Sequence, residues 1–147
     1  MGVTMFRSMT FMAVVLHALS ASAQQMPKTP QQPVDMGAYR AKAMAFLADD
    51  IADARGSGSN PKVSLTLVDL NGDGIPEALT RIESPGSCGT RGCTAYVLDL
   101  SGPSARSIGD FIAHSLEPLP TKTGAWRDVS VNGFKQAFHA GKYMPAR

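Results

Sequence analysis

The sequence is poor in the residues from which many catalytic and metal sites are built. It has only two cysteines, three histidines and one tryptophan among 147 residues, and its formal net charge is +2. Basic and acidic residues are interspersed, which argues against the clustered basic patch of a nucleic-acid-binding protein and against an acidic disordered tail. Two cysteines are too few for a disulfide-framework mini-protein. The length suits one domain and is short for two.

The first 23 residues have the composition of an export signal. Arg7 provides the only charge there, and an apolar stretch over residues 9–19 follows it. This stretch is well short of the roughly 20 residues that a membrane span needs. The Ala-Ser-Ala sequence that ends at Ala23 offers the small side chains that signal peptidases accept. We therefore expect residues 1–23 to be the signal peptide of a periplasmic or secreted protein; the alternative is a buried N-terminal helix.

Residues 24–34 form the next compositional unit, because they hold three prolines and little apolar surface. This composition predicts a flexible Pro/Gln-rich leader rather than a fold element. About 110 residues, 35–147, remain for a single compact domain. We expect no transmembrane segment in the mature chain.

The domain begins with the pattern of an amphipathic helix. Asp35 is a suitable N-cap, and Gly56 suits a left-handed C-cap after the last apolar residue of the pattern. Between them, apolar residues recur at the i, i+3/i+4 spacing that places them on one helix face. These residues are Tyr39, Ala43, Phe46, Leu47, Ile51 and Ala54.

After Pro61 the apolar period changes from helical to strand-like. Alternation predicts strands at residues 63–67, 78–82, 94–100, 107–112, 114–119, 126–131, 134–139 and 142–144. Pro118 and Pro120 restrict their strand to an edge or a strand end, and Asn132-Gly133 predicts a type I′ hairpin turn. Short connections favour antiparallel pairing. The expected fold class is therefore α+β, with an N-terminal helix packed on an antiparallel β-meander of about six to eight strands.

The most informative segment is the nonapeptide DLNGDGIPE at residues 69–77. Oxygen-bearing side chains stand at its positions 1, 3 and 5, a glycine at position 6 permits a sharp turn, and a carboxylate stands at position 9. Hard cations such as calcium bind in an oxygen shell of this kind. The expected ligands are Asp69, Asn71, Asp73, the carbonyl of Ile75, and Glu77.

This nonapeptide resembles the D-x-N-G-D-G-x-P-[DE] calcium loop of FG-GAP/VCBS-type repeats and, more loosely, EF-hand and dockerin loops. The resemblance covers only residues 69–77 and implies a structural calcium ion held by the same five residues. Thr80 stands where an EF-hand has its bidentate glutamate, and the flanks are strands, so an EF-hand sensor that opens on binding is not expected. No second copy of the loop is found, which excludes a multi-bladed propeller. The alternative is a metal-free hairpin loop, which the same Asn-Gly and Asp-Gly pairs favour.

The two cysteines, Cys88 and Cys93, are separated by four residues. This spacing differs from the C-x-x-C motif of redox enzymes, and there is no second pair for a zinc site. In an exported chain it predicts a disulfide that pins a loop between strands. Arg91 at the tip of that loop is either a solvated charge or a recognition residue.

Residues for catalysis are few and scattered along the chain. His114 and His139 lie in alternating strands, and Ser115 points away from His114 because neighbouring strand residues face opposite sides. Glu117 and Asp128 are a possible carboxylate pair that nothing in the sequence brings together. Trp126 and Tyr143 belong either to the core or to a sugar-binding face.

These observations favour a small exported, calcium-stabilised, non-catalytic binding or inhibitor-like module of the cell envelope. Its expected partner is an envelope protein or polymer, and not a nucleic acid. A hydrolase of an envelope polymer, acting through His114, Glu117 or Asp128, is one alternative. The other is an accessory or stress protein without a small ligand. A pocket that gathers those three side chains would favour the enzyme, and a rigid exposed loop around Arg91 would favour the binding module.

Overall fold

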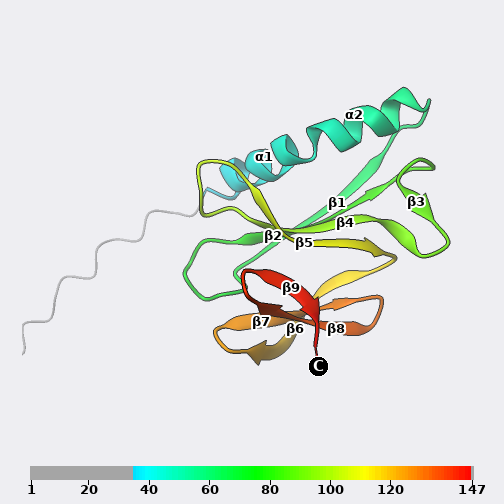
Figure 1. Cartoon of the computed structure of the whole chain (residues 1–147). Coiled ribbons are helices and arrows are strands. Elements are labelled where there is room, and N and C mark those ends of the chain that lie inside the picture. Colours follow the sequence, from blue (N-terminus) through cyan, green and yellow to red (C-terminus); the bar gives the residue numbers. More distant parts are fainter. Residues whose placement is uncertain (1–34, 147) are drawn as a thin grey trace, which may run out of the picture. The chain divides into compact units, whose positions relative to one another are not determined.

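The computed structural model describes residues 35–146, so the predicted signal peptide (1–23) and leader (24–34) lie outside the described residues. Within this range, helices α1 (Met36–Phe46) and α2 (Ala48–Gly56) come before nine strands. The strands are β1 (Lys62–Val68), β2 (Glu77–Glu83), β3 (Cys88–Gly89), β4 (Gly92–Asp99), β5 (Arg106–Ala113), β6 (Leu116–Thr123), β7 (Trp126–Val131), β8 (Phe134–His139) and β9 (Lys142–Pro145). Figure 1 shows their arrangement.

The helical segment begins as the sequence predicts. The side chain of Asp35 accepts hydrogen bonds from the backbone N–H groups of Gly37 (3.0 Å) and Ala38 (3.2 Å), and so caps α1. Four of the six residues of the expected apolar face are buried: Ala43, Leu47, Ile51 and Ala54.

The end of the predicted helix differs in two respects. The segment forms two helices, because the backbone of Leu47 turns to ψ −1° and ends α1 while its side chain stays fully buried beside Ile82. The expected left-handed cap at Gly56 is also wrong. Gly56 is the last residue of α2, Ser57 is the C-cap, and the left-handed backbone occurs at Gly58 (φ 80°).

The strands form two antiparallel sheets rather than one meander, and they number nine within residues 35–146. The first sheet has the order β1-β2-β4-β3, with β5 also paired to β4; the second has the order β6-β7-β8-β9. The chain leaves the first sheet after Ala113, and β6 then pairs with β7 instead of β5. The expected meander is wrong at this point because β5 and β6, which a two-residue connection joins, do not pair with each other.

Two local predictions about the second sheet are confirmed. The β7–β8 turn has positive φ at both Asn132 (54°) and Gly133 (84°), as a type I′ turn requires. Strand β6, which contains Pro118 and Pro120, lies at the edge of its sheet. A proline lacks the N–H group that an inner strand would need, so an edge strand accommodates it.

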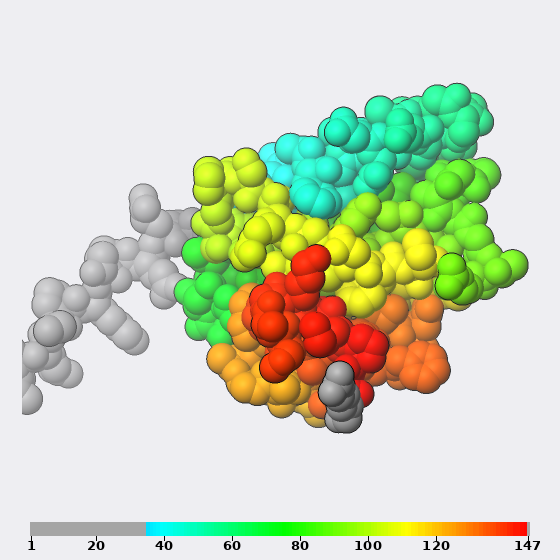
Figure 2. Space-filling view, viewed as in Figure 1, coloured from blue at the N-terminus to red at the C-terminus, as the bar shows by residue number. Residues whose placement is uncertain are grey.

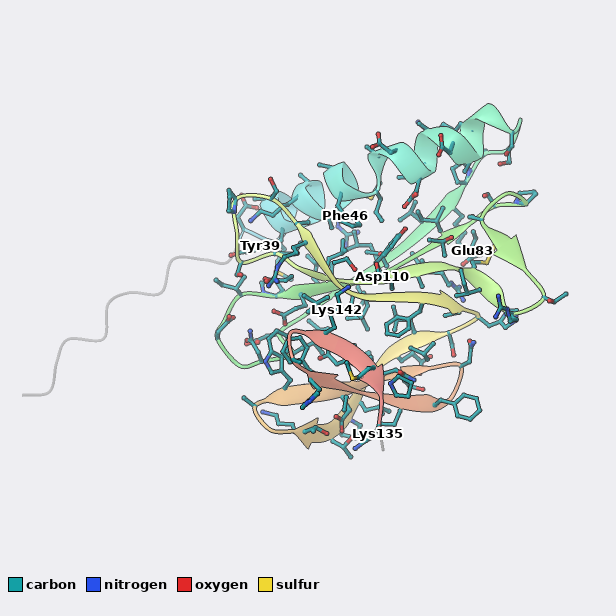
Figure 3. All side chains as sticks on the ribbon, in the orientation of Figure 1. Tyr39, Phe46, Glu83, Asp110, Lys135 and Lys142 are labelled. Atoms are coloured by element: carbon teal, nitrogen blue, oxygen red, sulfur yellow. A yellow bond between two sulfur atoms is a disulfide. The ribbon has the colours of Figure 1, made fainter. Side chains whose placement is uncertain are left out.

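Within residues 35–146, the first sheet lies between the two helices and the second sheet (Figure 1). On one face, alternate residues of β2 and β4, such as Ala78 and Leu98, pack against the helices. On the other face, Leu79 and Val97 pack against Val129 of the second sheet. At the edge where β5 meets β9, an exposed ion pair joins Lys142 to Asp110 at 3.8 Å (Figure 3).

Candidate metal centre

The DLNGDGIPE nonapeptide joins β1 to β2. Val68, the last residue of β1, pairs directly with Glu77, the first residue of β2, so the loop between them has its two ends side by side. Gly72 (φ 82°) and Gly74 (φ 86°) adopt left-handed backbone conformations that most other residues avoid. The loop therefore curls back on itself, as a metal-binding loop must.

The acidic side chains of the loop bind its own backbone. The carboxylate of Asp69 accepts hydrogen bonds from the N–H groups of Gly72 (2.6 Å) and Gly74 (3.0 Å). Asn71 Oδ1 accepts one from the N–H group of Asp73 (2.8 Å), and Asp73 Oδ1 accepts one from that of Ile75 (2.7 Å). These contacts hold the three side chains within a turn of the same loop.

Glu77 differs from the other acids because its side chain is buried, with 1% of its surface exposed. Its Oε2 accepts a hydrogen bond from the backbone N–H group of Leu70 (2.8 Å), and its Oε1 has only a long contact of 3.5 Å with Asn71 Nδ2. Burial, followed by the negative charges of Asp73, Asp69 and Asp99, raises the pKa of Glu77 to about 7, against the opposing effect of the Leu70 hydrogen bond. Burial and the neighbouring acids therefore oppose the ionisation of Glu77 in the folded protein.

Leu70 connects the loop to the second sheet. Its side chain is fully buried in the core between the two sheets. Its carbonyl accepts a hydrogen bond from the N–H group of Arg127 in β7 (2.7 Å), and the carbonyl of Arg127 accepts one from the Tyr143 hydroxyl in β9 (2.6 Å). Burial and the charges of Glu77 and Asp128 raise the pKa of Tyr143. The loop therefore joins the two sheets through a continuous series of hydrogen bonds.

The loop carries the oxygen-bearing side chains that hard cations prefer as ligands. None of the ion pairs among residues 35–146 involves Asp69, Asp73 or Glu77, so these three carboxylates of the loop have no basic partner within that range. Each carboxylate oxygen has more than one acceptor site, so the hydrogen bonds to the loop do not exhaust them. No group of three His, Cys, Asp or Glu side chains in the described part of the chain is already arranged around a metal position. Binding would therefore require the side chains of Asp69 and Asp73 to rearrange from their hydrogen bonds with the loop backbone.

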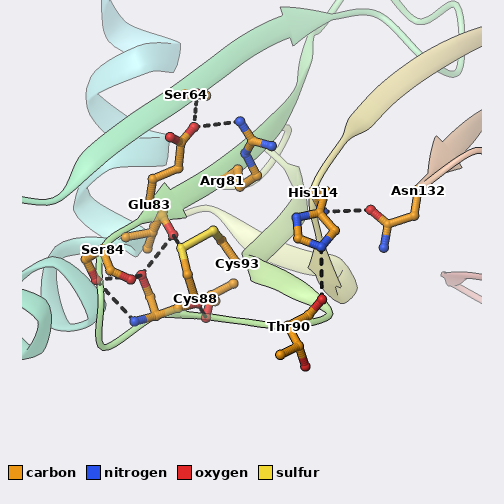
Figure 4. Close-up of a disulfide and its surroundings, with 12 residues drawn as sticks. Ser64, Arg81, Glu83, Ser84, Cys88, Thr90, Cys93, His114 and Asn132 are labelled. Carbon is orange, nitrogen blue, oxygen red and sulfur yellow. Dashed lines mark hydrogen bonds and ion pairs between the residues drawn. A yellow bond between two sulfur atoms is a disulfide. The ribbon is translucent and has the colours of Figure 1, made fainter.

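The disulfide predicted between Cys88 and Cys93 is present. These residues form a directly opposed pair of β3 and β4, so the bond closes a hairpin whose tip is Thr90-Arg91 (Figure 4). Arg91 is exposed at this tip. The loop is thus pinned as expected, although it contains a short strand that the sequence did not predict.

The three side chains considered for hydrolysis are not brought together. No hydrogen bond or ion pair among the described residues joins any two of His114, Glu117 and Asp128. The prediction that His114 lies in a strand is wrong: it follows β5 in the two-residue connection to β6, and its Nε2 contacts the carbonyl of Thr90 (3.2 Å). Glu117 is exposed on β6. Asp128 is fully buried on β7.

Asp128 is the buried member of a polar cluster on the second sheet, whose other members are exposed. Its carboxylate accepts hydrogen bonds from the hydroxyls of Thr121 and Thr123 (both 2.7 Å) and from Lys135 Nζ (2.9 Å). These bonds and the Lys135 charge outweigh burial and lower the pKa of Asp128. The carboxylate is therefore ionised and fully occupied with structural contacts.

The aromatic residues considered for sugar binding form a cluster with Phe138 instead. Trp126 stacks on Phe138 with ring centroids 3.9 Å apart, and Tyr143 packs edge-on against both rings. All three contribute to the core between the sheets. The core interpretation of Trp126 and Tyr143 is confirmed.

Sequence reasoning missed two residues that organise this molecule. Asn132 was expected only to form a turn, yet its Oδ1 also accepts hydrogen bonds from the N–H groups of His114 (2.6 Å) and Ser115 (3.2 Å). Leu70 occupies a variable position of the calcium-loop pattern. The one indication in the sequence that it is buried is that it is apolar and lies between the polar residues Asp69 and Asn71. Neither contact is visible in the sequence because each joins segments that are far apart in the chain.

Within residues 35–146, no helix is both long and apolar enough to span a bilayer. The chain matches no protein-family model, no curated protein and no solved structure.

Proposed function

We propose that this protein is a small exported, non-catalytic binding module of the cell envelope, in which the loop at residues 69–77 holds a structural calcium ion. The observation that carries the proposal is the set of three carboxylates without a basic partner, one of them buried, in the β1–β2 loop, which is hydrogen-bonded through Leu70 to the second sheet. Calcium would be bound by the side chains of Asp69, Asn71, Asp73 and Glu77 and by the carbonyl of Ile75. The ion supplies positive charge that the protein itself lacks at this position.

The role of the ion is to stabilise the packing of the two sheets. Without a cation, burial and then the charges of Asp73 and Asp69 oppose ionisation of Glu77, whose Oε2 accepts a hydrogen bond from the N–H group of Leu70. A bound cation removes this repulsion and allows Glu77 to stay ionised beside Leu70. Leu70 in turn positions Arg127 of β7. Calcium binding should therefore stabilise both sheets together, and not only the loop.

The binding role is supported by the disulfide hairpin, whose exposed tip carries Arg91. The Cys88–Cys93 bond closes this hairpin, and His114 contacts the carbonyl of Thr90 at its tip. Reaction chemistry has less support, since His114, Glu117 and Asp128 are separated and Asp128 is already occupied. The disulfide is consistent with an oxidising compartment outside the cytoplasm. These features together favour a rigid recognition surface on a stabilised scaffold.

The calcium site is tested by thermal unfolding of the mature, oxidised protein in chelator and in millimolar calcium. Extracellular calcium modules bind with dissociation constants of about 0.1–1 mM. At about ten times such a constant, binding to the folded state alone adds on the order of 1.4 kcal/mol. Because 1 kcal/mol moves the Tm of a domain of this size by about 4 °C, the expected rise is several degrees. Magnesium should have a smaller effect because it dehydrates reluctantly.

Variants localise the effect to the loop. Asp73→Asn keeps an oxygen that can accept the N–H group of Ile75 but removes the charge, so it should abolish the calcium-dependent rise. Asp53→Asn, on the exposed surface of α2, removes the same charge elsewhere and should leave the rise unchanged. The loop would be only a turn if calcium raised the Tm of both variants equally, or if it did not change the Tm of the wild type.

A further inference from the structure

The disulfide hairpin borders a hollow of about 390 Å³ on the surface of the first sheet. The hairpin itself, residues 86–92, forms most of its wall, and Thr94 of β4 and Ile112 of β5 complete it. Thr94 and Ile112 are a directly opposed pair, so their side chains lie on the same face of the sheet. The hairpin projects at the right-hand edge of the molecule in Figure 2.

The chemistry of this hollow combines one cation with one apolar surface. Arg91 is the charged residue among the described residues that line it, and no ion pair of residues 35–146 engages its guanidinium. Ile112 exposes 47% of its surface, although it is a large aliphatic residue, and it lies near the end of β5, an outer strand of the first sheet. A guanidinium binds a carboxylate through two parallel hydrogen bonds. The hollow is therefore complementary to a ligand that carries a carboxylate beside an apolar group.

The backbone of the hollow's wall is constrained at two places, which fixes the point from which the Arg91 side chain extends. The bond between Cys88 and Cys93 closes the hairpin. At Gly92 the backbone approaches β5 so closely that an added Cβ would lie 2.2 Å from the carbonyl carbon of Ala113. A fixed loop loses little conformational freedom on binding, and this favours affinity.

The tip of the hairpin is also held from the second sheet. His114 Nε2 contacts the carbonyl of Thr90 at 3.2 Å, and Asn132 Oδ1 accepts the N–H group of His114 at 2.6 Å (Figure 4). The hairpin tip, the end of β5 and the β7–β8 turn are thus linked by side-chain hydrogen bonds. The hairpin tip is therefore held by side-chain hydrogen bonds in addition to the disulfide.

We propose that this hollow binds a segment of another protein that places a carboxylate on Arg91 and an apolar side chain on Ile112. The inference rests on the proposed function as a binding module and specifies its site and the chemistry of its partner. A peptide segment supplies both groups on neighbouring residues, whereas a polysaccharide supplies acidic groups without an apolar side chain. The small size of the hollow suits a few side chains, as in weak and transient contacts.

The test is selection of random heptapeptides, displayed on phage, against the mature oxidised protein. The expected consensus has aspartate or glutamate close to leucine, isoleucine or phenylalanine. The affinity of the consensus peptide is then measured by fluorescence anisotropy. Arg91→Ala should weaken binding about tenfold or more, because it removes a charge-assisted contact. Ile112→Ser should also weaken it, and Arg91→Glu should shift the selected peptides from acidic to basic residues.

Matched controls distinguish this site from general surface properties. Arg40→Ala removes an exposed arginine from α1, and Phe134→Ser removes a side chain that is 74% exposed, more than Ile112. Neither lines the hollow, so neither should change the affinity. Cys88→Ser/Cys93→Ser should weaken binding by loosening the wall, although it leaves Arg91 and Ile112 in place.

Three results would overturn the inference: no consensus, a consensus without an acidic residue, or a peptide whose affinity does not depend on Arg91 and Ile112. Binding to polyanions such as heparin without selection of an apolar side chain would also contradict it. The selection is performed in calcium and again in chelator. Failure of the peptide site is therefore separate from failure of the calcium site, which the Tm reports independently.

Discussion

Replacement of Glu77 by glutamine tests the electrostatics of the loop. In the folded protein, burial and the neighbouring charges of Asp73, Asp69 and Asp99 raise the pKa of Glu77 to about 7 from an ordinary value of 4.5. A group whose pKa is higher in the folded state favours folding below its unfolded pKa, and this contribution is lost as the pH rises through the folded pKa. The difference between the ordinary and the folded-state pKa of Glu77 corresponds to about 3 kcal/mol of folding free energy. In calcium-free buffer this stability is lost between roughly pH 4.5 and pH 8.

Glu77→Gln removes this penalty and retains an oxygen that can accept the N–H group of Leu70. In chelator at pH 8, the variant should therefore be more stable than the wild type by up to about 3 kcal/mol, and near pH 4.5 the two should be nearly equal. Urea unfolding at both pH values measures the difference. In saturating calcium the variant should gain less stability than the wild type, because it lacks a charged ligand.

The exposed Glu117 provides the control. Glu117→Gln makes the same chemical change on the surface of β6 and should alter the stability by less than about 0.5 kcal/mol at either pH. If Glu77→Gln is no more stable than the wild type at pH 8 in chelator, the burial of an uncompensated charge at this position is refuted.

Three other outcomes follow from the sequence and the structure. Unreduced protein should have two hydrogen atoms fewer than reduced protein by mass spectrometry, and loss of the Cys88–Cys93 bond should lower the free energy of unfolding by roughly 2 kcal/mol. Asp128→Ala should destabilise the fold by about 1–3 kcal/mol, because it leaves the hydroxyls of Thr121 and Thr123 and the ammonium group of Lys135 without their acceptor. Since the pKa of Asp128 is lowered, its contribution is present at neutral pH and is lost as the pH falls through that lowered pKa, which acid unfolding monitors. N-terminal sequencing of exported protein should begin at Gln24, and an intact Met1 on such material would contradict the predicted signal peptide.

Local features of the fold were predictable because their causes lie in neighbouring residues. Asp35 caps α1 with the N–H groups two and three residues ahead, and Asn132-Gly133 forms its turn through the backbone preferences of those two residues. The strand positions follow from alternation, which needs only a few residues to be visible. The disulfide follows from the spacing of the two cysteines in a chain that the sequence predicts to be exported.

Features that depend on distant residues were not predictable in this way. The division into two sheets depends on whether β6 pairs with β5 as well as with β7, and the connection at His114 and Ser115 carries no signal for that choice. The burial of Asp128 depends on partners that the β6–β7 hairpin and β8 bring to it. The oxygen-rich pattern of the loop is local, whereas the link from Leu70 to Arg127 spans two sheets. The motif therefore indicated a candidate site but not its connection to the core.

The most direct test of the calcium loop is a calcium titration followed by backbone amide NMR on the mature oxidised protein. We expect the largest changes within residues 69–77, saturating in the millimolar range or below. Changes should extend to Arg127 of β7, whose N–H group donates to the Leu70 carbonyl, and should be absent from the exposed surface of α2. A spectrum that is unchanged by calcium, or one in which only the acidic residues of α2 respond, would contradict a calcium ion that stabilises the packing of the two sheets.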